Sequence, residues 1–288
     1  MPTQDSLTVI IPTLTNTKGL RYLLSHLLDY RLIVVDNLPS QLKQKLCQAH
    51  DNCLYLPQQN NLGFARAINL AFTHVKTDWI CILNDDIEFP ATPPFEALIK
   101  LAKKNTWQAI SPLLKQPGGK VENIGYRVLP IGRVELVFSS VGQRDLDGLT
   151  AACLLVKSSA FRDIDGFDDR FFAYLEDVDL FLRFKNAGYQ FGVANRHVVL
   201  HNHMTTSSKM NNFKAKMDLR NWVFVIVKNW PIKTIFQYLP GIILERFRNL
   251  SGFLKATWRS YRLRSFYFLP RDLVQVIWGW LSFPLRRS

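Results

Sequence analysis

Cysteine is scarce in this chain, and no pattern joins the few that occur. Neither a CxxC pair nor a metal-ligand spacing is found among Cys47, Cys53, Cys81 and Cys153. Cys81 and Cys153 lie in apolar runs that are typical of buried strands. We therefore expect no disulfide scaffold and no structural metal, and a reduced, cytosolic setting fits best.

Long hydrophobic runs are missing as well. No apolar stretch approaches the ~18 residues that span a bilayer, so we expect no transmembrane helix. The first six residues have no basic segment, and the apolar run after them stops at Pro12, so we expect no signal peptide. A GxGxxG loop is absent after that run, which argues against a dinucleotide-binding oxidoreductase. With 288 residues and 48% hydrophobic side chains, the chain can still bury one substantial core.

Acidic residues are few in the last quarter of the chain. From residue 216 onward, thirteen Lys or Arg stand against three Asp or Glu, so this part carries +10 of the net charge of +13. Five of the seven tryptophans lie there too. This change in composition predicts a domain over residues 1–215 and a basic, Trp-rich helical region over residues 216–288.

The first half of the chain alternates apolar, β-rich runs with helical patterns. Ala67, Ala71 and Val75, for example, keep a helical period. Such alternation is typical of an α/β fold, a mostly parallel sheet flanked by helices, whose ligands gather at the carboxyl ends of the strands. The sequence leaves the pairing of residues 116–147 open. We expect strands at residues 7–11, 31–35, 54–56, 79–83, 109–113, 151–156, 189–194 and 198–201.

An acidic turn follows the apolar strand expected at residues 79–83. Asn84, Asp85 and Asp86 place polar side chains where that strand leaves the core. Adjacent carboxylates repel each other unless a cation joins them, and a divalent ion that bridges to a diphosphate would do so. The structural alternative is an Asp-rich turn that caps the next helix, and the dipeptide alone favours that alternative.

A second acidic cluster lies in the first turns of a helix expected over residues 175–186. Helix spacing places Glu176, Asp179 and Arg183 on one face, where Asp179 and Arg183 can pair, and it directs Asp177 elsewhere. Acids at a helix start also complement the helix dipole, which explains one or two of them. The dipole does not explain why the preceding residues, 171–174, are mostly aromatic.

His201 ends a short apolar strand and is a further candidate. A lone histidine in such a place is more often structural than a ligand. Together with an acidic site elsewhere in the fold, however, it becomes a candidate contact for a metal ion or a diphosphate.

Six motifs occur in the order seen in family 2 glycosyltransferases, and the chain resembles the rhamnosyltransferase-like branch of that family. The resemblance covers roughly residues 7–230, and the ordered combination is far more specific than any single motif. It implies a GT-A fold. The motifs are Val9–Thr13, Asp36–Asn37, Asn61–Ala65, Leu83–Asp86, Gly166–Phe172 and Glu176–Leu180.

The resemblance also implies roles for individual residues. Asp177 matches the catalytic base, Asp86 matches the metal-binding acid of the DXD-type motif, and His201 would lie near the metal and diphosphate. Asn84 stands at the first DXD position, and Ala151 stands where a glycine is frequent. The acceptor side would include Phe172, Tyr174 and Glu176. Donor contacts are expected from Pro12, Thr13, Asp36, Asn61, Gly63, Asn84 and Asp85.

The resulting hypothesis is an inverting transferase that depends on Mg²⁺ or Mn²⁺. It would move a sugar from a nucleoside-diphosphate donor to a glycan or lipid-linked acceptor in cell-surface polysaccharide synthesis. The nucleotide would be dTDP or UDP, and rhamnose is one candidate for the sugar. A single base and in-line attack predict inversion. The alternatives are a sugar-nucleotide pyrophosphorylase, whose Gly-rich loop is missing here, and a basic membrane- or nucleic-acid-binding module without catalysis.

The basic tail predicts a membrane partner rather than nucleic acid. One apolar helical stripe recurs at spacings of three and four, with Lys and Arg on both sides. The structural alternative is a helix that packs on the catalytic core. We expect a helix at the surface of an anionic membrane, which would make the protein cytoplasmic and peripheral on the inner face of the cell membrane. The stripe consists of Ile243, Phe247, Leu250, Leu254, Trp258 and Tyr261.

Overall fold

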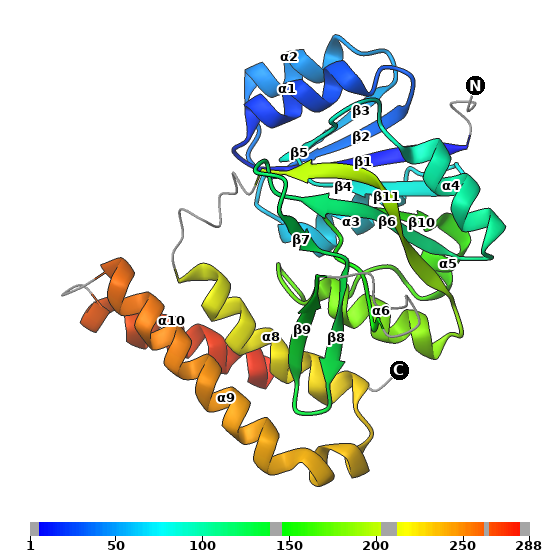
Figure 1. Cartoon of the computed structure of the whole chain (residues 1–288). Helices are drawn as coiled ribbons and strands as arrows, with labels where there is room; N and C mark the ends of the chain where they lie inside the picture. The colour runs from blue at the N-terminus through cyan, green and yellow to red at the C-terminus, as the bar shows by residue number, and fades with distance from the viewer. Residues whose placement is uncertain (1–5, 139–145, 203–211, 262–264, 283–288) are drawn as a thin grey trace.

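The computed structural model describes residues 6–138, 146–202, 212–261 and 265–282, and a single large sheet organises the N-terminal part (Figure 1). Within these residues nine strands form that sheet, in the order β3-β2-β1-β4-β10-β6-β11-β5, with β7 added to β6. The strands are β1 (Leu7–Thr13), β2 (Arg31–Asp36), β3 (Cys53–Pro57), β4 (Trp79–Leu83), β5 (Ile87–Glu88), β6 (Ala109–Lys115), β7 (Val121–Asn123), β10 (Cys153–Lys157) and β11 (Phe191–His201).

The sheet is mixed. Strands β3, β2, β1 and β4 run parallel, as expected from the sequence. Strand β10 lies antiparallel to both β4 and β6, because its first residue, Cys153, pairs with Leu83 at the carboxyl end of β4. The α/β prediction is confirmed, although antiparallel pairs are more frequent than a mostly parallel sheet implies. The two short strands expected near residues 189–201 are one irregular strand, β11, parallel to β6.

Helices cover both faces of the sheet, because the side chains of its central strands alternate between two cores. In β1, Val9 and Ile11 pack with α1 (Thr17–His26), α2 (Gln41–Gln48) and α4 (Phe95–Lys104). Ile10 points to the opposite face, where α3 (Gly63–Phe72), α5 (Ser158–Asp163) and α6 (Glu176–Asn186) contribute the core. A strand buried on both faces is continuously apolar, and so these strands were visible in the sequence.

The segment that the sequence left unassigned contains a hairpin, β8 (Gly125–Leu129) with β9 (Arg133–Val137), which extends from the sheet towards the C-terminal helices (Figure 1). Gly132 closes its turn with a φ of +72°, a conformation that favours glycine. Part of this segment, residues 139–145, lies outside the described residues.

The C-terminal part is helical, as predicted. Helices α8 (Phe213–Asn229), α9 (Ile232–Tyr261) and α10 (Ser265–Ser282) pack on one another through Leu219, Phe253 and Val276. Helix α8 also contributes Trp222 and Phe224 to the core of the sheet. The boundary expected between residues 215 and 216 therefore falls inside α8. Among the described helices, none combines the length and the hydropathy needed to cross a bilayer.

Candidate active site

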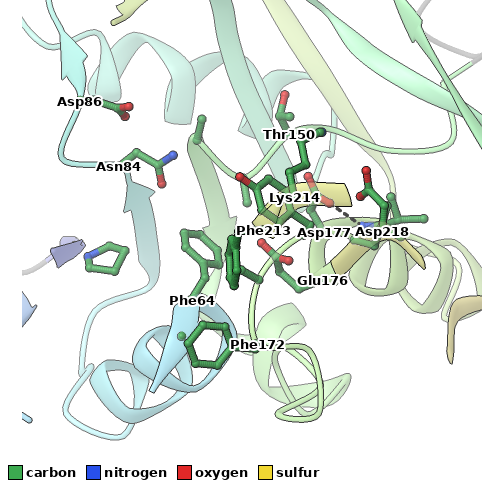
Figure 2. A pocket seen from close by; sticks show the side chains of 18 of the residues that line it. Phe64, Asn84, Asp86, Thr150, Phe172, Glu176, Asp177, Phe213, Lys214 and Asp218 are labelled. Atoms are coloured by element: carbon green, nitrogen blue, oxygen red, sulfur yellow. Dashed lines mark hydrogen bonds between the residues drawn. The ribbon is translucent and has the colours of Figure 1, made fainter. Parts of the chain in front are cut away.

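A cleft of about 1040 Å³ opens where the carboxyl ends of β1 and β4 meet the start of α6 (Figure 2). The hairpin β8–β9 and helix α8 complete its walls. Its volume lies at the upper end of the range for small-molecule sites, which is roughly 300–1,000 Å³. Most of the residues singled out in the sequence line this cleft: Pro12, Thr13, Asn61, Gly63, Asn84, Asp85, Asp86, Phe172, Tyr174, Glu176, Asp177 and His201.

The two predicted donor contacts Thr13 and Asp85 meet across strands β1 and β4. The Thr13 hydroxyl donates to Asp85 Oδ2 at 2.7 Å, and the Asn16 side-chain amide donates to the Asp85 carbonyl at 2.7 Å. Burial, together with the negative charge of Asp86, raises the pKa of Asp85 to about 7, although the hydrogen bond from Thr13 opposes the shift. The acidic turn is thus fixed to the first strand rather than only capping a helix.

Asp86 lies beside His201, and Glu122 is a third member of the group. The His201 imidazole has Nε2 at 3.2 Å from Asp86 Oδ1 and Nδ1 at 2.8 Å from Glu122 Oε2. Burial alone would lower the pKa of His201, but the hydrogen bonds with Asp86 and Glu122 outweigh it and raise that pKa to about 9. One imidazole therefore lies between two carboxylates.

This group suits a divalent cation. Asp86 is only 4% exposed, and its Oδ2 has no hydrogen-bond partner among the described residues. No closed cage of three or more ligands is found in the described part of the chain. One or two protein ligands that leave room for phosphate oxygens and water are, however, the usual way in which Mg²⁺ is held beside a nucleotide. Glu122 hydrogen-bonds the far nitrogen of His201, as carboxylates do for metal-binding histidines.

The loop before α3 forms another part of the wall through its backbone. Asn61 Oδ1 accepts from the Gly63 N–H at 2.9 Å, and Asn37 Oδ1 accepts from the Leu62 N–H at 3.0 Å. Gly63 has a φ of +78°, and a Cβ at this position would lie 2.2 Å from the Phe172 carbonyl oxygen. A glycine is required here because the loop passes so close to the chain that leads into α6.

Asp36 is the one predicted donor contact that does not line the cleft. It is fully buried, and Lys43 Nζ lies 2.5 Å from its Oδ1, while the Tyr55 hydroxyl donates to its Oδ2 at 2.7 Å. Its neighbour Asn37 lines the cleft instead. The structure thus gives Asp36 internal partners, and its contact with a nucleoside stays a prediction.

Asp177 and Glu176 begin helix α6 and face the cleft opposite Asp86 (Figure 2). The Val178 N–H donates to Asp177 Oδ1 at 2.8 Å. Burial raises the pKa of Asp177 to about 6, although backbone hydrogen bonds and Lys214 oppose the shift. Burial and the charge of Asp177 raise the pKa of Glu176 to about 8. The pKa values of both adjacent carboxyls therefore lie above their usual range.

An aromatic cluster lies beside these acids. The rings of Phe172 and Tyr174 each lie with their centroids 6.1 Å from that of Phe213, and the Lys214 ammonium lies 5.0 Å from the Tyr174 ring centroid. Phe172 and Tyr174 were predicted on the acceptor side, and they line the cleft next to the acids. Aromatic faces of this kind suit the apolar faces of sugar rings.

Several lining residues escaped the sequence analysis, and for Asp218 and Trp222 the reason is that most of α8 falls in the region predicted to associate with a membrane. Lys214, Asp218 and Trp222 all face the cleft from α8, and Arg133 faces it from the hairpin. The spacing of four residues between Lys214, Asp218 and Trp222 places them on one face of a helix. That pattern was present in the sequence, but nothing local indicated which surface the face would meet.

The fold and the site together define the class, a GT-A glycosyltransferase. Among solved structures, the chain is similar to the mannosyltransferase PcManGT from Pyrobaculum calidifontis in complex with GDP-Man and Mn²⁺. The TM-score is 0.59 at 14% identity, over 94% of this chain and 80% of that one. Residues 8–162 match the model for glycosyl transferase family 2, so the chain belongs to that family. Membership favours a transferase over the pyrophosphorylase and the non-catalytic module.

Two curated relatives are rhamnosyltransferases. The N-acetylglucosaminyl-diphospho-decaprenol L-rhamnosyltransferase of Mycobacterium tuberculosis is 27% identical over 179 residues, which is 51% of this chain and 57% of that protein. The rhamnosyltransferase WbbL of Escherichia coli is 24% identical over 230 residues, which is 73% of this chain and 82% of that protein. The chain thus matches little more than half the length of the mycobacterial relative.

Proposed function

We propose that this chain transfers a sugar from a nucleoside-diphosphate donor to a hydroxyl of a glycan or lipid-linked acceptor, with inversion at the anomeric carbon. One observation carries the proposal. Asp86 and the Asp177 carboxylate lie on opposite sides of one cleft (Figure 2), and His201 lies beside Asp86. Such an arrangement supports a leaving diphosphate on one side and an attacking hydroxyl on the other.

Asp177 acts as the general base in this proposal. Its carboxylate takes the proton of the acceptor hydroxyl while the acceptor oxygen bonds to the anomeric carbon. The bond from that carbon to the diphosphate oxygen breaks, and the electron pair leaves with the nucleoside diphosphate. General-base catalysis of this kind accounts for roughly 10²–10⁴-fold in rate. Inversion follows because a single displacement attacks from the face opposite the leaving group.

Asp86 and His201 are the residues that would hold Mg²⁺ or Mn²⁺, with Glu122 orienting the imidazole. A divalent ion there would neutralise the charge that develops on the departing diphosphate. Thr13 and the loop around Gly63 hold in place the walls of the part of the cleft that would bind the donor. The complex of the similar mannosyltransferase with GDP-Man and Mn²⁺ supports this assignment.

The names of the two relatives make rhamnose the first sugar to test. We propose dTDP or UDP as the nucleotide that carries it. The names equally support an acceptor that belongs to cell-surface polysaccharide synthesis. Ala151 lies just before the strand that borders the cleft, so its methyl group narrows the site relative to a glycine. We expect this to affect the choice of sugar.

A panel of nucleotide sugars tests the proposal. Release of nucleoside diphosphate is measured for each donor with a lipid-diphosphate-linked sugar acceptor, in the presence of Mg²⁺ or Mn²⁺ and in excess EDTA. We expect release with one donor class, dependent on the cation, and loss of transfer in Asp177→Asn with donor binding kept. Full activity in EDTA, or transfer by Asp177→Asn at the normal rate, would contradict the proposal.

We further propose that α9 and α10 attach the protein to an anionic membrane at the inner face of the cell membrane. Helix α9 leaves Ile243, Phe247, Leu254 and Trp258 exposed, although Leu250 of the predicted stripe packs against α8 and α10. The side chain of Tyr261 lies outside the described side chains. Exposure of most of the stripe favours a lipid surface over packing on the core. The docking face comprises Ile232, Phe236, Leu239, Ile243, Leu244, Phe247, Leu254 and Trp258 of α9 with Val274, Ile277, Trp278 and Leu281 of α10.

Basic side chains border the docking face. Lys233, Arg248, Lys255, Arg259 and Arg271 are exposed on the same two helices. Each basic residue close to an anionic membrane contributes about 1 kcal/mol, so a few of them together with the apolar side chains suffice for binding. In this proposal α8 belongs with the catalytic part, because it contributes to both the core and the cleft.

A further inference from the structure

The chain that leads into helix α6 has an unusual backbone. Tyr174 and Leu175 have φ values of +66° and +67°, so two consecutive residues that are not glycine adopt the left-handed conformation. Side chains rarely tolerate this region, and it persists only where the surrounding structure imposes it. The next two residues are Glu176 and Asp177, the acids that face the cleft.

A buried asparagine of α8 holds this left-handed turn. Asn221 is fully buried, and its side-chain amide donates to the Ala173 carbonyl at 2.9 Å and to the Tyr174 carbonyl at 2.7 Å. A carbonyl oxygen can only accept, so the contacts assign the orientation of the amide. Both donors of the Asn221 NH₂ group therefore engage the backbone immediately before α6.

The start of α6 depends on this contact for its direction. Its N-cap residue, Leu175, makes no side-chain capping bond to the first turn. The dihedral angles of Tyr174 and Leu175 set the angle at which the chain enters α6, and thereby where the Asp177 carboxylate points. Asn221 itself is absent from the lining of the cleft, so it acts through the turn rather than on a substrate.

We propose that Asn221 is a positioning residue that holds the Asp177 carboxylate in place by fixing the backbone of Ala173 and Tyr174. This inference rests on the proposed role of Asp177 as the base. It assigns to α8, far along the sequence, a direct part in aligning the reaction. A displacement of a catalytic group by about 1 Å is enough to lower a rate by about 10²-fold.

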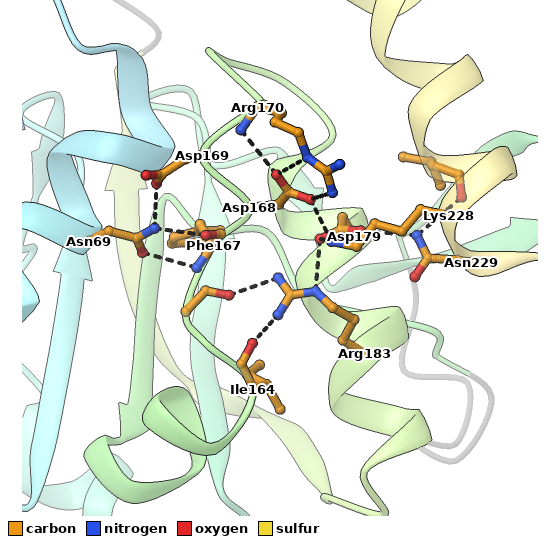
Figure 3. A network of polar contacts seen from close by, with 12 residues as sticks. Asn69, Ile164, Phe167, Asp168, Asp169, Arg170, Asp179, Arg183, Lys228 and Asn229 are labelled. Atoms are coloured by element: carbon orange, nitrogen blue, oxygen red, sulfur yellow. Dashed lines mark hydrogen bonds and ion pairs between the residues drawn. The ribbon is translucent and has the colours of Figure 1, made fainter. Parts of the chain in front are cut away.

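A separate network anchors α8 to the same region, so we expect the helix to stay in place when Asn221 is replaced (Figure 3). Lys228 Nζ lies 2.6 Å from Asp168 Oδ2 and 3.0 Å from Asp179 Oδ2. Asn229 donates to Asp179 Oδ1 at 3.0 Å, and Arg183 Nε donates to Asp179 Oδ2 at 2.9 Å. These contacts lie two turns along α8 from Asn221 and do not involve the left-handed turn.

Asn229 supplies a matched control on the same helix. Its side-chain amide donates to Asp179 and to the Val225 carbonyl. Like Asn221 it therefore engages two acceptors, although the Asn229 side chain is only half-buried. The experiment compares Asn221→Ala, Asn221→Asp and Asn229→Ala in the full chain. It measures kcat, the KM for donor, the melting temperature and the pH profile of kcat.

We expect Asn221→Ala to lower kcat by roughly 10–100-fold while the donor KM changes by less than about twofold. Asn221→Asp removes both N–H donors but keeps the shape of the side chain, and it should lower kcat as much as Asn221→Ala does. The acidic limb of the pH profile should also move, because Asp177 leaves its present surroundings. Asn229→Ala should lower the melting temperature. Its kcat should stay within about twofold of the unchanged protein, and the acidic limb of its pH profile should not move.

A merely structural role for Asn221 predicts a different result. The melting temperature would fall in both Ala variants, and the two variants would have the same kcat and the same pH profile. That outcome would overturn the inference. Asp177→Asn, assayed in parallel, separates the two proposals. If Asp177→Asn keeps transfer, the proposed function fails, whereas loss of transfer in Asp177→Asn with normal kcat in Asn221→Ala overturns only the positioning role.

Discussion

At the scale of single residues, the two adjacent acids of α6 show how position decides chemistry. Burial raises the pKa of Asp177 to about 6 and that of Glu176 to about 8, where the charge of Asp177 adds to the effect. Lys214 and Asp218 of α8 and Tyr126 of β8 also face this pair. Burial therefore favours the protonated form of both acids, and the charge of Asp177 favours it further at Glu176.

The first prediction concerns pH. Asp177 can accept a proton only as a carboxylate, so kcat/KM should rise as the pH increases through about 6, the raised pKa of this group. A pH series from acid to neutral, with donor binding followed by calorimetry at each point, checks it. A rate that is flat across this range, with binding unchanged, would show that a different group accepts the proton.

The second prediction separates Glu176 from Asp177. Glutamine resembles the protonated form that Glu176 adopts below its raised pKa of about 8. Glu176→Gln should therefore keep kcat at neutral pH within about threefold, whereas Asp177→Asn should lose roughly 10²–10⁴-fold. Both are compared in one transfer assay, with melting temperatures as a check on folding. If Glu176→Gln is the more damaging change, the roles of the two acids are exchanged.

The third prediction concerns the candidate cation site. Glu122 contacts Nδ1 of His201, so Glu122→Gln should leave the imidazole less well oriented. We expect affinity for Mn²⁺ to fall about tenfold or more, as is typical when such outer partners are replaced. Calorimetric titration of Mn²⁺ in the presence of nucleoside diphosphate measures this without the transfer reaction. Glu96→Gln, an exposed change on α4, is the control, and equal affinity in the two variants would argue against the assignment.

At the scale of elements, the site depends on close contact between the loop before α3 and the chain before α6. The Phe64 N–H donates to the Phe172 carbonyl at 2.7 Å, and Gly63 leaves no room for a Cβ beside that carbonyl. The sequence placed the loop and the aromatic residues in the same site, but it could not show that they touch. That contact joins segments that lie far apart along the chain.

The fourth prediction follows from this contact. Gly63→Ala adds a Cβ 2.2 Å from the Phe172 carbonyl oxygen and strains a φ of +78°, so it should lower both stability and transfer. A residue other than glycine in such a conformation costs on the order of 1–3 kcal/mol. Gly118→Ala is the control, because a Cβ there meets nothing within 4 Å. Thermal unfolding and transfer assays of both variants check it, and equal behaviour would show that the close approach of the two segments is unimportant.

At the scale of the whole molecule, α8 lies between the catalytic sheet and the helices that bear the docking face (Figure 1). It packs against α9 and α10 through Leu219 and against the sheet core through Trp222. Cutting the chain near Lys214 would therefore remove part of the active site together with the docking face. Membrane binding has to be tested in the full chain with surface substitutions.

The fifth prediction provides that test. Phe236→Glu combined with Phe247→Glu places two negative charges on the docking face, where these side chains are 71% and 64% exposed. Cosedimentation with vesicles of phosphatidylglycerol and phosphatidylcholine should fall strongly, and high salt should weaken binding of the unchanged protein. Leu42→Glu, an exposed position on α2, is the control. Equal sedimentation of all three proteins would remove the docking face from consideration.

The sequence by itself determined the features that depend on local pattern. Continuous apolar runs indicated the strands that are buried on both faces, and the ordered motifs indicated the family and a part of the residues that line the cleft. The pairing of Asp179 with Arg183 also followed from helix spacing, and the two groups lie 2.9 Å apart. These features depend on neighbours within a few residues, and so they could be predicted without a fold.

Only the tertiary structure decided which surfaces those patterns meet. The antiparallel entry of β10, the internal partners of Asp36 and the place of α8 in the active site all depend on packing that no local pattern specifies. Asn221 illustrates the reason. In the sequence it is one polar residue in a helix, and only packing brings its amide against the carbonyls of Ala173 and Tyr174, just before helix α6.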